Sequence, residues 1–228
     1  MVEKNTVKAS GQVKKERYVE IFENGGALRV LFVGNSITRH EPKPEIGWVH
    51  DWGMAASSKD KDYVHLTVKM LEEKYGKVDY CITNCGEWEL NYFEDGLINE
   101  WQRARDFNAD IIFYRMGENI WNSRDKFDSY PLKPRFENMV KYFKLNPDAK
   151  IVLTGMFWEI SEIEEIVKQV ALDNGYPFVQ MNDLGKDKQY MAIGQYWHEG
   201  VSIHPNDLGM QKIAERIVQA FYKIEQGK

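Results

Sequence analysis

The chain has 228 residues, of which 43% are hydrophobic and 29% are charged, and its formal net charge is −5 at pH 7. This composition is that of an ordinary globular protein, and the acidic excess argues against the basic surface that general nucleic-acid binding needs. Apolar runs such as residues 30–33 are far shorter than the roughly 20 residues of a membrane-spanning helix. Two cysteines, Cys81 and Cys85, are too few for a disulfide scaffold.

Residues 1–17 are polar and charged, and we expect them to form a solvated lead-in to a single domain that spans residues 18–228. They contain no apolar segment typical of a signal peptide, which favours a cytoplasmic protein. Removal of a signal from a longer precursor would leave no trace, so a secreted or periplasmic protein stays open. A short helix is expected over residues 17–23. No Pro-, Gly- or Ser-rich linker divides the rest of the chain, which favours one domain.

From residue 28 onwards, short apolar runs alternate with amphipathic segments. The apolar runs predict strands at residues 28–33, 78–83, 110–115, 150–154 and 177–181. Helical spacing of apolar residues predicts helices at residues 63–75, 97–107, 134–146, 159–174 and 206–222. The strands are apolar through their centres, which indicates a parallel sheet covered by helices on both faces. In such sheets ligands bind beyond the carboxyl ends of the strands, so the residues that follow each strand are the candidates for function.

Ser36 follows the first predicted strand, directly after a Gly-Asn pair. Such a pair allows a sharp turn, which would leave the serine hydroxyl exposed at the sheet edge and its own N–H free to donate. The plain alternative is a serine that caps a helix. A phosphate-binding loop is a weaker option, because the segment lacks the glycine spacing and the lysine of such loops.

Three more residues occupy comparable positions. Gly86 follows the second strand and could bring its N–H close to a ligand, and Asn119 follows the third and could donate a side-chain N–H into the same crevice. His204 begins a His-Pro-Asn-Asp segment in which the Pro-Asn pair fits the start of the last helix. Taken singly, a turn glycine, a loop-shaping asparagine and a packed or surface histidine explain them equally well.

Together, the order of Ser36, Gly86, Gly-x-Asn119 and His204 resembles the SGNH superfamily, also called the GDSL-like hydrolases, from about residue 28 to the C-terminus. The resemblance implies an α/β protein with a three-layer α/β/α, flavodoxin-like fold and a five-stranded parallel sheet. It also implies a serine esterase that needs no metal and no cofactor. In it, Ser36 resembles the nucleophile and His204 the general base. Gly86 and Asn119 resemble the donors of the oxyanion hole, with the Ser36 N–H as a third.

These groups suit ester hydrolysis for chemical reasons. A serine hydroxyl is a poor nucleophile at neutral pH and needs a base within hydrogen-bonding reach to accept its proton. A histidine with an ordinary pKa of about 6.5 can do this near working pH. Attack on an ester carbonyl forms an oxyanion, which fixed N–H donors stabilise.

One position departs from the family pattern, which commonly has an acid three residues before the histidine. Here that position is Val201, and the nearest upstream acid is Glu199. Three arrangements are open: Glu199 orients His204, an acid from another loop does so, or a backbone carbonyl holds the imidazole in a Ser–His dyad. We favour the last two. His198, Glu199 and His204 lack the spacing of a metalloprotease site, so no metal is predicted.

The long segment 39–61 between Ser36 and the first long helix is expected to contribute to substrate binding. Trp48, together with Trp88 after the second strand, could line a wall for a sugar ring or an apolar alcohol, and Glu199 lies near the same edge. Arg39 could meet an anionic group of the substrate. The alternatives are tryptophans packed against the sheet edge and an arginine on the surface.

The sequence therefore predicts a metal-independent serine esterase that removes small acyl groups, such as acetyl, from a carbohydrate or a similar ester. The expected partner is a small-molecule or glycan ester, with neither nucleic acid nor a membrane span. Two other activities fit the same residues: a lipase- or thioesterase-type acyl hydrolase, and an acyltransferase. A degenerate site that only binds carbohydrate is the non-catalytic alternative.

Overall fold

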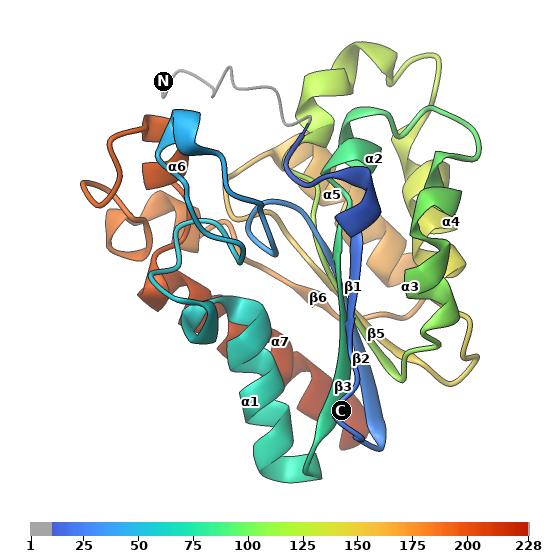
Figure 1. The fold of residues 1–228 in the computed structure, drawn as a ribbon. Coiled ribbons are helices and arrows are strands. Elements are labelled where there is room, and N and C mark those ends of the chain that lie inside the picture. Colours follow the sequence, from blue (N-terminus) through green and yellow to red (C-terminus); the bar gives the residue numbers. More distant parts are fainter. Residues whose placement is uncertain (1–10, 228) are drawn as a thin grey trace.

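The computed structural model describes residues 11–227 and shows a β-sheet enclosed between two layers of helices (Figure 1). The sheet order is β1-β3-β2-β4-β5-β6, and every neighbouring pair is parallel except β1 with β3. The five parallel strands have the flavodoxin-like order, which confirms the predicted three-layer α/β/α class. The six strands are β1 (Val19–Phe22), β2 (Leu28–Gly34), β3 (Val78–Asn84), β4 (Ile111–Arg115), β5 (Lys150–Thr154) and β6 (Phe178–Val179).

The four longest helices, α1, α4, α5 and α7, lie where the sequence predicts helices. They are α1 (Tyr63–Tyr75), α2 (Gly86–Leu90), α3 (Gln102–Asp106), α4 (Leu132–Phe143), α5 (Ser161–Asp173), α6 (Glu199–Ser202) and α7 (Asp207–Glu225). Short 3₁₀ segments are η1 (Lys15–Arg17), η2 (Pro44–Ile46), η3 (Lys59–Lys61), η4 (Leu97–Trp101), η5 (Ile120–Lys126), η6 (Leu184–Lys186) and η7 (Lys188–Tyr190). The predicted helix at residues 97–107 is η4 followed directly by α3.

The central strands separate two apolar cores. In β2, Leu31 and Val33 pack into the core that contains α3, α4 and α5, whereas Val30 and Phe32 pack into the core that contains α1 and α7. All four side chains are fully buried. Burial on both faces explains why this strand carries no polar side in the sequence.

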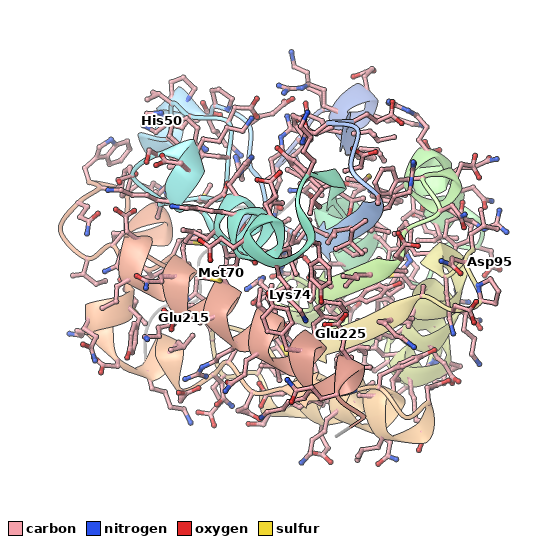
Figure 2. The ribbon with its side chains drawn as sticks, turned by 90° about the horizontal axis from the view of Figure 1, so that it is seen from below. His50, Met70, Lys74, Asp95, Glu215 and Glu225 are labelled. Atoms are coloured by element: carbon pink, nitrogen blue, oxygen red, sulfur yellow. The ribbon has the colours of Figure 1, made fainter. Side chains whose placement is uncertain are left out.

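Helices α1 and α7 lie side by side over one face of the sheet, as Figure 2 shows from below. Their C-terminal turns are joined by an ion pair of 2.6 Å between Lys74 and Glu225. This end of the molecule lies opposite the carboxyl ends of the parallel strands, where the candidate site is found.

The first strand corrects one expectation. The segment 17–23 is predicted to contain a short helix, but residues 19–22 form the edge strand β1, antiparallel to β3. Phe22 stacks on Tyr80 of β3 with ring centroids 4.6 Å apart. Pairing with β3 therefore decides the conformation of a segment whose local sequence favours no structure strongly. The sheet consequently has six strands rather than the predicted five.

The described part of the expected lead-in, residues 11–17, is mostly exposed, but two of its residues are packed against the domain. Gln12 and Val13 are both buried, and the Gln12 side chain accepts a hydrogen bond from the amide of Asn84 at 2.9 Å. Residues 1–10 of that lead-in lie outside the described structure. Within residues 11–227, no helix is long and apolar enough to cross a membrane.

Candidate active site

Ser36 lies in a tight turn that follows β2. The N–H groups of Thr38 and Arg39 both donate to the carbonyl of Asn35, at 2.9 and 3.0 Å. A side chain at Gly34 would collide with that of Thr38, so a residue without a Cβ is required where the strand enters the turn. The turn leaves Ser36 only 8% exposed, at the carboxyl edge of the sheet.

Ser36 meets His204, although the two residues are 168 positions apart in the sequence. Ser36 Oγ lies 3.0 Å from His204 Nε2, and His204 Nδ1 lies 2.6 Å from the carbonyl oxygen of Gly200. A carbonyl oxygen can only accept, so the proton of the neutral ring resides on Nδ1 and Nε2 offers its lone pair to the serine hydroxyl. The structure thus has the dyad arrangement, in which a backbone carbonyl orients the histidine.

Glu199 does not take the orienting position. It is exposed at the start of α6, and its backbone carbonyl, rather than its carboxylate, accepts a hydrogen bond from Ser202 Oγ at 3.0 Å. Among the residues that the structure describes, no carboxylate hydrogen-bonds to His204. The short helix α6 brings the Gly200 carbonyl to the ring, since that residue lies four positions before the histidine.

The imidazole of His204 is held in its neutral form. Burial lowers the pKa of His204 to about 3, against the opposing effect of the hydrogen bond to Gly200. His204 is 5% exposed, and its ring packs edge-on against that of Trp158 with ring centroids 4.9 Å apart. A second imidazole, that of His40, is built in the same way: its Nδ1 lies 2.6 Å from the Glu41 carbonyl, and burial lowers its pKa to about 4.

The expected oxyanion donors differ in their availability. In residues 11–227, no protein group accepts a hydrogen bond from the Ser36 N–H. Asn119 donates one amide hydrogen to Glu89, which leaves its second amide hydrogen for a ligand. By contrast, the Gly86 N–H donates to Asn84 Oδ1 at 2.9 Å. The structure therefore offers two of the three expected donors, while the third is engaged within the protein.

Trp48 and Trp88 do not form a wall for a substrate. Trp48 is fully buried, and its Nε1 donates to the His40 carbonyl at 3.0 Å. Trp88 is 3% exposed and packs edge-on against Phe136 of α4 at 6.2 Å. Both rings are too well covered to stack on a ligand, so they belong to the packed interior.

Arg39 is likewise committed to the protein. Its side chain is buried, and the guanidinium bonds to Asp51 at 2.9 Å, to Glu20 at 3.0 Å and to the carbonyl of Arg17 at 2.9 Å. These contacts fasten the segment after Ser36 to β1. The expectation that Arg39 meets an anionic substrate group therefore has no support in this geometry.

Two segments remote in sequence pack together at this end of the molecule. Residues 39–61 and 191–203 lie next to one another at the same end of the molecule in Figure 1. Trp48 and Met54 from the first segment share a small buried cluster with Ala192 and Val201 from the second. This cluster joins the segment after Ser36 to the segment that carries the carbonyl of Gly200.

Trp197 is an aromatic residue at this end that the sequence reasoning missed. It is 73% exposed, and its ring lies against Gly47, where an added Cβ would collide with it. It precedes His198, with ring centroids 5.5 Å apart. Its exposure depends on how two distant loops pack, and local sequence carries no signal for that.

Groups of three or more His, Cys, Asp or Glu side chains that could hold a metal ion are absent from the described residues. Both cysteines are buried and unpaired, and burial raises the pKa of each thiol far above its ordinary value. A thiolate nucleophile at Cys85 therefore has no support.

Three solved structures with a similar fold are described as lipases or esterases. A protein described as a GDSL-like lipase from Parabacteroides merdae shares 19% identity over 86% of this chain and 95% of its own, with a TM-score of 0.58. The family 3 carbohydrate esterase of Clostridium thermocellum shares 14% identity over 88% of this chain and 98% of its own, with a TM-score of 0.57. The acetyl xylan esterase AlAXEase shares 14% identity over 85% of this chain and 99% of its own, with a TM-score of 0.54.

The chain shares its fold with these structures, and two solved structures of this fold are described as GDSL-like lipases, in agreement with the fold that the sequence resemblance implies. At these identities, the likeness concerns the fold. No protein-family model and no curated protein matches the sequence itself.

We predict that both buried histidines stay neutral well below the ordinary histidine pKa. Imidazole ¹⁵N chemical shifts of His204 and His40 should not titrate between pH 8 and about pH 5, and both should report the tautomer with the proton on Nδ1. A titration midpoint near 6.5 would contradict this. Since the unfolded chain takes up protons that the folded chain refuses, these two residues also cost stability as pH falls below about 6.5.

Proposed function

We propose that the protein is a metal-independent serine esterase with Ser36 as nucleophile and His204 as general base. The supporting observation is the 3.0 Å contact from Ser36 Oγ to His204 Nε2, with the opposite ring nitrogen held by the Gly200 carbonyl. This contact is within the reach that proton transfer from a serine requires. The ester-hydrolase descriptions of the structural neighbours agree with this chemistry.

In the first half of the reaction, Ser36 Oγ attacks the ester carbonyl carbon while His204 Nε2 takes the hydroxyl proton. The resulting oxyanion receives hydrogen bonds from the Ser36 N–H and from the second amide hydrogen of Asn119. Collapse of this intermediate breaks the bond to the alcohol, which leaves with the proton from Nε2. In the second half, a water molecule gives a proton to Nε2 and attacks the acyl-serine. Collapse of this second intermediate breaks the bond to Ser36 Oγ, which takes the proton back from Nε2 as the carboxylic acid is released.

The dyad sets limits on this chemistry. Burial makes His204 a weak base, so formation of the imidazolium is costly unless the site stabilises it. The Gly200 carbonyl helps, because its hydrogen bond with Nδ1 strengthens once the ring is charged. Preorganised donors for the oxyanion consequently have to supply much of the transition-state stabilisation.

We propose a small acyl group on a carbohydrate as the substrate. Ser36 and His204 are only 8% and 5% exposed, which favours a short acyl group such as acetyl over a long chain. The exposed ring of Trp197 offers a face on which a sugar could stack, next to the segment that positions the histidine. Two of the structural neighbours are described as carbohydrate-directed esterases.

The role of Ser36 is tested by Ser36→Ala. We expect turnover of p-nitrophenyl acetate to fall by at least about 10³-fold, because water alone must then replace the serine. The control is Ser161→Ala, an exposed serine at the start of α5 and outside the site, which should retain wild-type turnover. Equal turnover by wild type and the folded Ser36→Ala variant would contradict the proposed role of Ser36 as nucleophile.

The dyad is tested by comparing Glu199→Gln with His204→Ala. The Glu199 carboxylate is exposed and makes no contact with the ring, so its neutralisation should change kcat by no more than about twofold. Loss of the imidazole should cost about 10³-fold or more. A Glu199→Gln loss that approaches the His204→Ala loss would make Glu199 the orienting acid.

The carbohydrate assignment is tested by Trp197→Ala. We expect KM for acetylated xylo-oligosaccharides to rise about tenfold, the equivalent of about 1.4 kcal/mol of lost stacking, with kcat nearly unchanged. KM for p-nitrophenyl acetate, which has no sugar, should stay the same. Leu172→Ala is the matched control, because Leu172 is also exposed, at 62%, but lies on α5. Equal changes for both substrates would argue against a sugar platform.

A further inference from the structure

A buried carboxylate lies directly behind the proposed oxyanion donor. Glu89 belongs to α2, the short helix after β3, and its side chain is fully buried. One of its oxygens accepts a hydrogen bond from the Gly117 N–H, and the other accepts one from the side-chain amide of Asn119. Glu89 thus holds the loop after β4 at two points, and one of them is the side chain of the expected oxyanion donor.

The same carboxylate also reaches the turn that carries the nucleophile. The side-chain nitrogen of Asn35, the residue before Ser36, lies 3.0 and 3.2 Å from the two oxygens of Glu89. The Asn119 amide and the Ser36 turn are therefore bound to one common group. Their relative positions follow from this carboxylate, which spans the ends of three neighbouring strands.

A second buried carboxylate completes the network. Glu118 accepts hydrogen bonds from Asn35 at 2.7 Å, from Arg115 at 2.8 Å and from the N–H of Phe157 at 2.9 Å. Its contacts run to β4, β2 and the end of β5, but none reaches Asn119. Only Glu89 contacts the donor amide, so the two acidic residues have separable roles.

We propose that Glu89 is a positioning residue for Asn119, and that it fixes the amide so that the second amide hydrogen points to the oxyanion formed at Ser36. This inference rests on the proposed esterase function. It does not make Glu89 a catalytic residue, because the carboxylate touches only protein donors.

The chemistry of the contact favours a carboxylate over any other side chain. An ionised carboxylate is acceptor-only and can serve all three donors: the Gly117 N–H and the amides of Asn119 and Asn35. A glutamine would present one NH₂ group to these donors and would lose at least one of the hydrogen bonds. An apolar side chain would fill the space without fixing the rotation of the Asn119 amide.

Burying this charge is costly, which argues against a role in packing alone. Burial, reinforced by the nearby charge of Glu118, raises the pKa of Glu89, while the hydrogen bonds from Asn119, Gly117 and Asn35 oppose the rise. Well-packed apolar residues are often as stabilising as buried ionic groups, or more so. A buried carboxylate at this position therefore favours a role in fixing the geometry of the Asn119 amide.

The first test compares Glu89→Gln with wild type on p-nitrophenyl acetate. Rotation of the Asn119 amide should lower kcat by about 10- to 100-fold, somewhat less than outright loss of an oxyanion donor, and KM should stay within about twofold. A variant with wild-type kcat would overturn the proposal, as would one that changes KM alone. The control is Glu164→Gln, a buried carboxylate that accepts from Gln180 and Asn182 and should retain wild-type kcat and KM.

The second test asks whether Glu89 acts through Asn119. If it does, Glu89→Gln should cost little once Asn119→Ala has removed the amide, so that the double variant lies within about threefold of Asn119→Ala alone. Multiplying losses would show that Glu89 acts independently of the amide and would overturn the proposal. A merely structural role for Glu89 predicts such multiplication.

Two further comparisons keep the result decisive. Thermal unfolding shows whether Glu89→Gln folds, and if it does not, Glu89→Asp takes its place, because it retains the charge but withdraws the carboxylate from Asn119. Glu89→Asp should then show the same selective loss of kcat. A Glu89→Asp variant with wild-type kcat would overturn the proposal. Ser36→Ala separates the two levels of inference. Wild-type turnover by Ser36→Ala would refute the esterase itself, whereas an inactive Ser36→Ala beside a fully active Glu89→Gln would refute only the positioning role.

Discussion

The candidate site depends on one hydrogen-bonded line from the Ser36 hydroxyl through the imidazole of His204 to the carbonyl of Gly200. The turn after β2 positions the serine, and the short helix α6 presents the carbonyl. Because the group that holds Nδ1 is a backbone carbonyl and not a side chain, the fold itself holds the ring in one tautomer.

The topology of the sheet explains why chain-distant groups can meet. Ser36 follows β2 and Asn119 follows β4, and these two strands are parallel neighbours in the sheet. The order of the parallel strands reverses between them, which is the position where ligands bind in sheets of this kind. The hydrogen bonds of Glu89 join the residues that follow β2 and β4, while the two cores on the faces of the sheet are apolar. The ends of these strands are thus joined twice, once by the pairing of the strands and once by the carboxylate.

The sequence was sufficient for the parallel strands and the candidates that follow them, because burial on both faces leaves a readable apolar run. It was insufficient for β1, whose four residues owe their conformation to pairing with β3. The sequence also did not predict which tryptophans are buried and which are exposed. Trp48 is buried and Trp197 is exposed, yet both lie in loops, and only the packing of one loop on the other distinguishes them. Glu89 was not among the residues predicted from the sequence, because its burial follows from contacts with the ends of two other strands.

The buried charges near the site offer a physical reason why a neutral carbonyl, and not a carboxylate, holds His204. Glu89, Glu118 and Arg115 are all buried, and with all three ionised they carry a net charge of −1 within the protein. A further carboxylate at position 201 would add a second buried negative charge at this edge, and each unpaired charge in such surroundings is expensive. The side chain of Val201 instead packs, fully buried, into the small cluster that joins segments 39–61 and 191–203. The buried negative charge thus lies where it accepts hydrogen bonds from the donors, and a neutral carbonyl orients the imidazole.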